Sequence, residues 1–139
     1  RRRHMSREPE VFMWSALLHD LGKATTTRVR NGRITSYDHD RDSEVLSSRF
    51  LNQFHCEAGF VQKVAKMCRW HMQILFVVRG LPFADIESMA SEVPIDEIAL
   101  LGLCDRLGRG GMTAERIEEE EGHIREFLSK CREALKTKV

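Results

Sequence analysis

The sequence predicts an all-α protein, a bundle of about five to seven helices with a short hairpin or loop excursion near residues 25–37. Apolar residues recur at helical spacing along most of the chain, and residues that favour helix starts, such as Pro9 and Pro94, precede these stretches. The only hairpin signal is an Asn-Gly pair between two short β-prone runs within 25–37. A length of 139 residues and a hydrophobic content of 42% suit a single domain spanning residues 1–139.

The first predicted helix begins at residues 8–10, Glu-Pro-Glu, because proline fits the first turn and acidic residues favour the positive end of the helix dipole. Residues 11–21 are apolar nearly all round, which predicts a central helix. Gly22 is its expected C-terminal stop. A buried His-Asp pair at residues 19–20, at the end of this helix, is costly unless a partner compensates it.

Further helices follow the hairpin, and they are predicted over 42–54, 58–72, 81–90, 95–107 and 113–136. Thr113 caps the last of them. The four acidic residues at 118–121 are expected to form a solvated face of that helix.

The charged residues are balanced, with 22 Lys and Arg against 21 Asp and Glu. This balance argues against binding to nucleic acid by net charge alone, but it allows local basic patches. No apolar run approaches the roughly 20 residues of a membrane span, and we expect neither a membrane nor DNA as a partner. The four cysteines form no CxxC pair and two lie in apolar helical stretches, so we expect reduced, buried thiols in a cytoplasmic protein.

His71 and Asp105 each continue an apolar stripe of a predicted helix. His71 follows Val64 and Cys68 at helical spacing, and Asp105 follows Leu101. Both side chains are therefore expected to point inward. Taken singly, an inward histidine is usually a hydrogen-bonded core residue, and an inward aspartate usually caps a helix or pairs with an arginine.

Together with the end of the first helix, these residues indicate a metal site. His19 and Asp20 lie at that end, and His39 lies in the predicted loop that enters the next helix. Histidine and aspartate are ligands of divalent metals, and the charge of the ion offsets the cost of burying a carboxylate. The residue types suit one or two ions of Mg, Mn, Fe, Co, Ni or Zn.

The order His19-Asp20, His39, His71, Asp105 resembles the HD superfamily of metal-dependent phosphohydrolases, all-α domains whose site lies inside a helical bundle. The stretches HDLGKATTTRVRNGRITSYDH and CRWHMQ resemble, more narrowly, the HD domain of bacterial tRNA nucleotidyltransferase (CCA-adding) and poly(A) polymerase-like proteins. The resemblance covers roughly residues 10–110. It implies that His19, Asp20 and Asp105 hold a first metal ion, and that His39 and His71 complete a second metal position or contact the phosphate.

The resemblance also implies a mechanism of metal-assisted phosphoester hydrolysis. Asp20 would bridge two metals or orient the attacking water, and His39 or His71 would protonate the leaving oxygen. Lys23 would bind the substrate phosphate at the rim of the site, and Arg109 is a second candidate for that role.

The sequence departs from the family pattern at two places. The pattern opens with another metal-binding histidine, and His4, 15 residues before His19, matches that position poorly. We therefore expect either that this helix precedes residue 1 in a longer protein or that the ligand has been lost. Residues 38–40, Asp-His-Asp, replace Gly-His-Glu and make the surroundings of His39 more acidic.

We therefore expect a metal-dependent phosphohydrolase that acts on phosphomonoester or phosphodiester bonds of nucleotides or RNA 3′ ends. The alternative is a non-catalytic HD-like module that binds RNA or a nucleotide, or that forms a structural part of a tRNA nucleotidyltransferase-like protein. The poor match at His4 favours this alternative, whereas the near-neutral net charge disfavours RNA binding by electrostatics alone. A purely structural helical bundle is the third reading, and the oligomeric state stays open.

Overall fold

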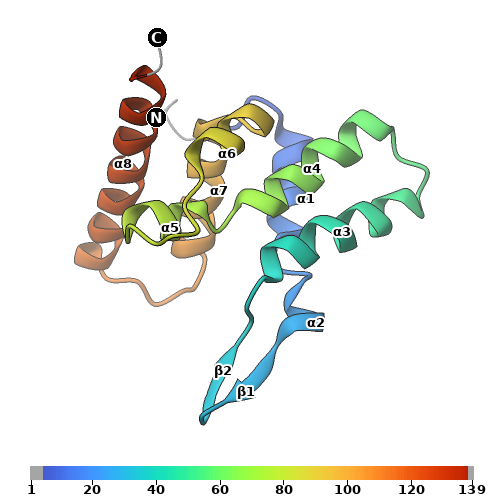
Figure 1. Cartoon of the computed structure of the whole chain (residues 1–139), viewed down its shortest axis with the longest axis horizontal. Helices are drawn as coiled ribbons and strands as arrows, with labels where there is room; N and C mark the ends of the chain where they lie inside the picture. The colour runs from blue at the N-terminus through green and yellow to red at the C-terminus, as the bar shows by residue number, and fades with distance from the viewer. Residues whose placement is uncertain (1–4, 138–139) are drawn as a thin grey trace. The chain divides into compact units, whose positions relative to one another are not determined.

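The computed structural model describes residues 5–137 as helices joined by loops, with one two-stranded hairpin (Figure 1). This architecture confirms the predicted all-α class with a short hairpin excursion. Contacts divide the chain into two compact units. We call Glu8–His71 the N-terminal unit, and residues 72–137 with 5–7 the C-terminal unit.

The N-terminal unit contains α1 (Pro9–Leu18), α2 (Lys23–Thr26), β1 (Arg28–Arg30), β2 (Arg33–Thr35), α3 (His39–Asn52) and α4 (Ala58–Trp70). Helix α4 packs against both α1 and α3. The buried apolar side chains that join these three helices are Leu18, Leu51, Val61, Val64 and Cys68. One small core therefore joins the C-terminal ends of α1 and α3 to α4.

Helix α1 differs from its prediction at its end and in its burial. It begins at Pro9 as expected but ends at Leu18, and Gly22, with φ of −61°, precedes α2 instead of terminating α1. Leu17 is 68% exposed, and the buried residues of α1 are Ser15 and Leu18. The prediction of a central helix is wrong, because only one face of α1 meets the core.

The hairpin has the predicted Asn-Gly turn. β1 and β2 pair antiparallel, with Val29 opposite Ile34 and Arg30 opposite Arg33. Asn31 and Gly32 have φ of 51° and 72°, the positive values that a tight hairpin turn requires at both central positions. Figure 1 shows the hairpin extending away from the start of α3.

Helix α3 begins at His39, earlier than the predicted start at residue 42. Asp38 precedes it in the left-handed conformation, with φ of 58°, a region that Asp tolerates better than most residues. His39 therefore lies on the first turn of a helix and not in a loop. Its side chain has a rigid backbone support.

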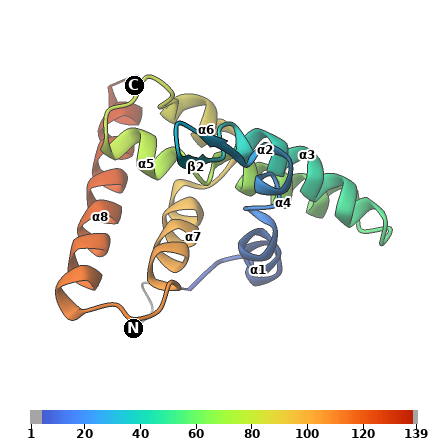
Figure 2. The same cartoon turned by 90° about the horizontal axis from the view of Figure 1, so that it is seen from below.

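The C-terminal unit contains α5 (Gln73–Val78), α6 (Ile86–Glu92), α7 (Ile95–Leu107) and α8 (Ala114–Lys136). Helix α8 packs against the other three, and α7 and α8 lie side by side in opposite chain directions (Figure 2). Thr113 caps α8 as predicted, accepting a hydrogen bond from the backbone N–H of Arg116. Helix α5 was not predicted, and α6 starts at Ile86 instead of residue 81 because Asp85 caps it.

Two details of the C-terminal unit correct the sequence predictions. Glu120, expected on a solvated face, is only 6% exposed, because its carboxylate pairs with Arg106 at 2.6 Å and with Arg116 at 3.1 Å. Cys104, on an apolar stretch of α7, is exposed. All four cysteines are free thiols. Within residues 5–137, no helix combines the length and apolar character that crossing a bilayer requires.

Candidate metal centre

Three helix ends in the N-terminal unit bring three histidines and one aspartate together. His19 and Asp20 follow α1, His39 begins α3, and His71 follows α4. Nε2 of His39 lies 3.1 Å from Nε2 of His71. Oδ1 of Asp20 is 3.5 Å from Nε2 of His39 and 3.7 Å from Nε2 of His71. Nε2 of His19 is 3.6 Å from Oδ2 of Asp20. We call these four residues the His/Asp cluster.

Each histidine is anchored through its other ring nitrogen to the backbone carbonyl oxygen three residues before it. Nδ1 lies 2.7 Å from the Ala16 carbonyl oxygen in His19, 2.8 Å from that of Ser36 in His39, and 2.6 Å from that of Cys68 in His71. A carbonyl oxygen can only accept, so Nδ1–H is the donor in each case. In the neutral ring the lone pair is then on Nε2, the nitrogen that faces the cluster. Such backbone hydrogen bonds are typical of metal-ligating histidines.

The spacing of the Nε2 and carboxylate atoms fits a metal ion. Among residues 5–137, the His19, Asp20 and His71 side chains are the set whose donor atoms all lie within 4.8 Å of one another. The donors present, imidazole and carboxylate, suit divalent transition metals.

The pKa values of the two facing histidines, His39 and His71, shift in opposite directions. Burial lowers the pKa of His71 to about 4, so its ring is neutral near pH 7. The hydrogen bond to Asp20 raises the pKa of His39 above its usual value. Burial alone would raise the pKa of Asp20, but His39, Lys23 and His19 together hold it well below the ordinary value. Asp20 therefore favours the protonated form of His39, whereas burial favours the neutral form of His71.

The cluster is open to solvent on one side. The three histidine side chains are 6–12% exposed, whereas the side chain of Asp20 is 39% exposed. Nζ of Lys23, itself 48% exposed, lies 2.7 Å from Oδ2 of Asp20. Lys23 therefore lies on the exposed side of the cluster, and its role in binding phosphate stays a prediction.

Gly22 and Ser43 hold the two sides of the cluster at a close distance. The backbone N–H of Gly22 donates to Oγ of the fully buried Ser43, at 2.8 Å. A Cβ on Gly22 would lie 2.0 Å from the carbonyl oxygen of His39. The close approach of α2 to the first turn of α3 therefore requires glycine, and it places His39 beside His19-Asp20.

An ion pair between Asp40 and Arg69, which the sequence did not predict, supports the cluster. Oδ2 of Asp40, which is 6% exposed, lies 3.0 Å from Nη1 of Arg69. The pair joins the residue after His39 to α4, two residues before His71. The acidic surroundings predicted for His39 are thus partly neutralised within the fold. The sequence alone carries no signal for this pair, since the burial of Asp40 is seen only in the structure.

Two predicted site residues lie in the other unit. Asp105, on the last turn of α7, and Arg109, in the loop after it, belong to the C-terminal unit, and both side chains are exposed. The expected burial of Asp105 is wrong, because the buried positions of α7 end at Leu103. Its role as a ligand stays a prediction. His4 lies outside the described residues.

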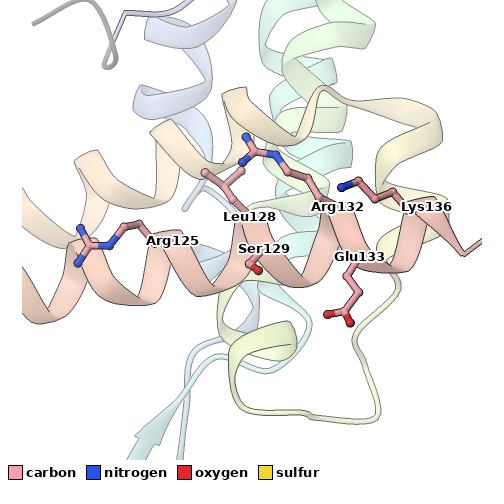
Figure 3. Close-up of a pocket in the computed structure, with 6 residues that line it drawn as sticks. All are labelled: Arg125, Leu128, Ser129, Arg132, Glu133 and Lys136. Carbon is pink, nitrogen blue, oxygen red and sulfur yellow. The ribbon is translucent and has the colours of Figure 1, made fainter.

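The C-terminal unit carries a shallow hollow of about 420 Å³ along α8 (Figure 3). The residues that line it are Arg125, Leu128, Ser129, Arg132, Glu133 and Lys136. Three of the six are basic, but Arg125 contacts Glu121 at 3.8 Å and Arg132 contacts Asp96 at 3.3 Å. The hollow has no cluster of metal-ligating side chains.

Comparison with protein-family models, curated proteins and solved structures finds no match to this chain. The chemistry of the His/Asp cluster is therefore the basis for assigning a function.

Proposed function

We propose that the His/Asp cluster is the metal centre of an HD-type, metal-dependent phosphohydrolase. The observation that supports this proposal is that the three histidines are held by the same kind of hydrogen bond. All three donate from Nδ1 to a backbone carbonyl and direct Nε2 toward one carboxylate. Three hydrogen-bonded core histidines would not need to share this orientation, whereas the ligands of one ion and a proton donor beside it do.

The pKa directions assign different roles to the two facing histidines. His71 is neutral near pH 7 and, with His19 and Asp20, suits a metal ligand. His39 keeps its proton more readily than an ordinary histidine. His71, His19 and Asp20 would hold the ion, and His39 would donate a proton to the leaving oxygen.

A divalent ion bound in the cluster would polarise a phosphoryl oxygen and make hydroxide available near neutral pH. The chain itself contributes the remaining functions. Lys23 neutralises the charge of the incoming phosphate on the open side of the cluster, and His39 supplies the proton. On the basis of the resemblance to tRNA-processing proteins, we propose nucleotides or RNA 3′ ends as substrates.

The test measures metal binding and hydrolysis on the same protein. Metal-stripped protein is titrated calorimetrically with Mn²⁺, Co²⁺, Ni²⁺ and Zn²⁺, and each loaded form is assayed with bis(p-nitrophenyl) phosphate. Asp20→Asn should lose both metal affinity and activity, each by roughly 100-fold or more. His39→Gln should keep metal affinity and lose roughly 100-fold in kcat.

The matched control is Asp38→Asn. Asp38 is exposed and precedes the cluster residue His39, and Asn tolerates its positive φ of 58°. This variant should behave as wild type. If no divalent ion binds and Asp20→Asn changes nothing, the enzyme proposal fails. The alternative is then a nucleotide- or RNA-binding module without catalysis.

A further inference from the structure

The β1–β2 hairpin presents two chemically different faces. Side chains alternate between faces along each strand, and Val29 pairs with Ile34 whereas Arg30 pairs with Arg33. Arg28 lies two residues from Arg30 and therefore on its side. We call the side formed by Arg28, Arg30 and Arg33 the arginine face. The opposite face consists of Val29 and Ile34, which are 74% and 78% exposed.

The arginine face carries uncompensated positive charge. All three of its arginines are exposed, and residues 21–37 contain no Asp or Glu. Within residues 5–137, none of the three arginines forms an ion pair with a carboxylate. Arg30 and Arg33 lie directly opposite each other, an arrangement that destabilises a strand pair. A polyanion bound to this face would offset that repulsion.

The base of the hairpin is held in place by hydrogen bonds. Oγ1 of Thr25 donates to the carboxylate of Asp42 on the first turn of α3, at 2.6 Å. Oγ1 of Thr27 and Oγ of Ser36 lie 2.8 Å apart across the two strands. An isolated two-stranded hairpin is marginally stable, so these contacts pre-organise the arginine face relative to α3.

The spacing of the charges suits a ligand with repeated phosphates. Arg28 and Arg30 are two strand positions apart, about 6.8 Å, which is comparable with the distance between successive phosphates of an extended nucleic-acid strand. Guanidinium groups bind phosphate through two parallel hydrogen bonds. A mononucleotide would contact only part of the arginine face.

An aromatic side chain adjoins the same face. The guanidinium of Arg30 lies 4.9 Å from the ring centroid of Tyr37, and Tyr37 is 64% exposed. Exposed aromatic rings next to arginines stack nucleic-acid bases, and this stacking tolerates any base sequence. The two aliphatic side chains of the opposite face offer a membrane little apolar area by comparison.

We propose that the arginine face and Tyr37 form a docking surface for a single-stranded polynucleotide. β1 leads back to His19-Asp20 and β2 leads directly to His39, so a strand bound there lies on the segment that joins two parts of the His/Asp cluster. The proposal goes beyond the proposed function, since binding at the hairpin does not require the cluster to be catalytic.

The experiment measures fluorescence anisotropy of a labelled oligouridine of about twelve nucleotides. The full chain is used in EDTA, which prevents metal-dependent cleavage. Arg28→Gln/Arg30→Gln/Arg33→Gln should weaken binding at least about tenfold at low salt. It should also reduce the slope of log K against log salt by about 2, as expected for the loss of three phosphate contacts on a single strand.

The matched control removes the same number of positive charges from the α8 hollow, by Arg125→Gln/Arg132→Gln/Lys136→Gln. This variant should bind the oligonucleotide as wild type does. Equal weakening by the two triple variants would show that only net charge matters and would overturn the proposal. Wild-type binding to phosphatidylglycerol vesicles without binding to oligouridine would overturn it too.

A second variant separates loss of binding from loss of the hairpin. Arg30→Glu places opposite charges across the strand pair with Arg33, which stabilises the hairpin, and it lowers the charge of the arginine face from three positive charges to a net one. Binding should weaken, by less than in the triple variant, because the charge of the face falls by two and not by three. If Arg30→Glu binds oligouridine as tightly as wild type, the arginine face is not the docking surface. Metal affinity, measured in parallel, should be unchanged in both hairpin variants.

Discussion

Gly22→Ala should destabilise the N-terminal unit and disturb the His/Asp cluster, although alanine fits the backbone conformation. The φ and ψ of Gly22 are −61° and −18°, a helical region open to every residue. The conflict is purely steric. The added Cβ would lie 2.0 Å from the His39 carbonyl oxygen and 2.7 Å from the Ser43 backbone nitrogen. Both atoms belong to the backbone of α3, so neither can rotate away.

The destabilisation can be estimated from the backbone shift that the added Cβ requires. A Cβ needs at least 3.0 Å from its neighbours, so α2 and the start of α3 must separate by about 1 Å. Overpacking of this kind costs about 1–3 kcal/mol. The shift also breaks the bond from the Gly22 N–H to Ser43, and a buried donor without a partner costs about 1–3 kcal/mol. We expect a loss of roughly 2–6 kcal/mol in the free energy of unfolding.

Urea denaturation followed by tryptophan fluorescence measures this loss, because both tryptophans, Trp14 and Trp70, lie in the N-terminal unit. The control is Gly59→Ala in α4, whose Cβ would make an ordinary contact at 3.6 Å with Glu57. It should be neutral or stabilise the unit by up to about 1 kcal/mol. Gly22→Ala should also weaken metal binding about tenfold or more. A destabilisation within about 0.5 kcal/mol of zero would refute the close-approach argument.

Two further predictions concern pH and thiol reactivity. In EDTA, the free energy of unfolding should rise with pH between about 4 and 6.5, because unfolded His71 binds a proton that the buried ring rejects. It should fall again above pH 6.5, because folded His39 retains its proton longer than the unfolded chain does. Urea titrations at several pH values test both assignments. His71→Gln should abolish the rise in the free energy of unfolding between about pH 4 and 6.5, and His39→Gln should abolish the fall above about pH 6.5. A rise or fall that persists in its variant contradicts the assignment. At pH 8, Ellman's reagent should label the exposed Cys104 first, whereas burial, which raises the pKa of Cys68 to about 12, should protect that thiol until the chain unfolds. Equal labelling rates, measured by mass spectrometry of peptides, would show that Cys68 is accessible.

Helical periodicity predicted the direction of His71 correctly but failed for Asp105. Both residues continue an apolar stripe, and His71 is 9% exposed as expected. The buried positions of α7 end at Leu103, so the same stripe reaches solvent one turn later. Periodicity gives the side of a helix on which a residue lies, but it does not tell how far the packing partner extends along the axis.

Contacts between distant segments limited the prediction of the site. The Asn-Gly turn of the hairpin is a local signal, and it was placed correctly. Asp40 and Arg69 are separated by 29 residues, and their ion pair depends on the packing of α3 on α4. The need for glycine at position 22 likewise arises from the backbone of α3. A sequence taken alone carries no signal of either relation.

The carbonyl-anchored histidines also have a topological consequence. His19 and His71 are 52 positions apart in the chain. An ion bound to both would close the intervening segment into one loop, as a single cross-link does. Closing a loop of such length removes roughly 4 kcal/mol of conformational freedom from the unfolded chain. The ion would thus join the ends of α1 and α4, and the hairpin would lie within the closed loop.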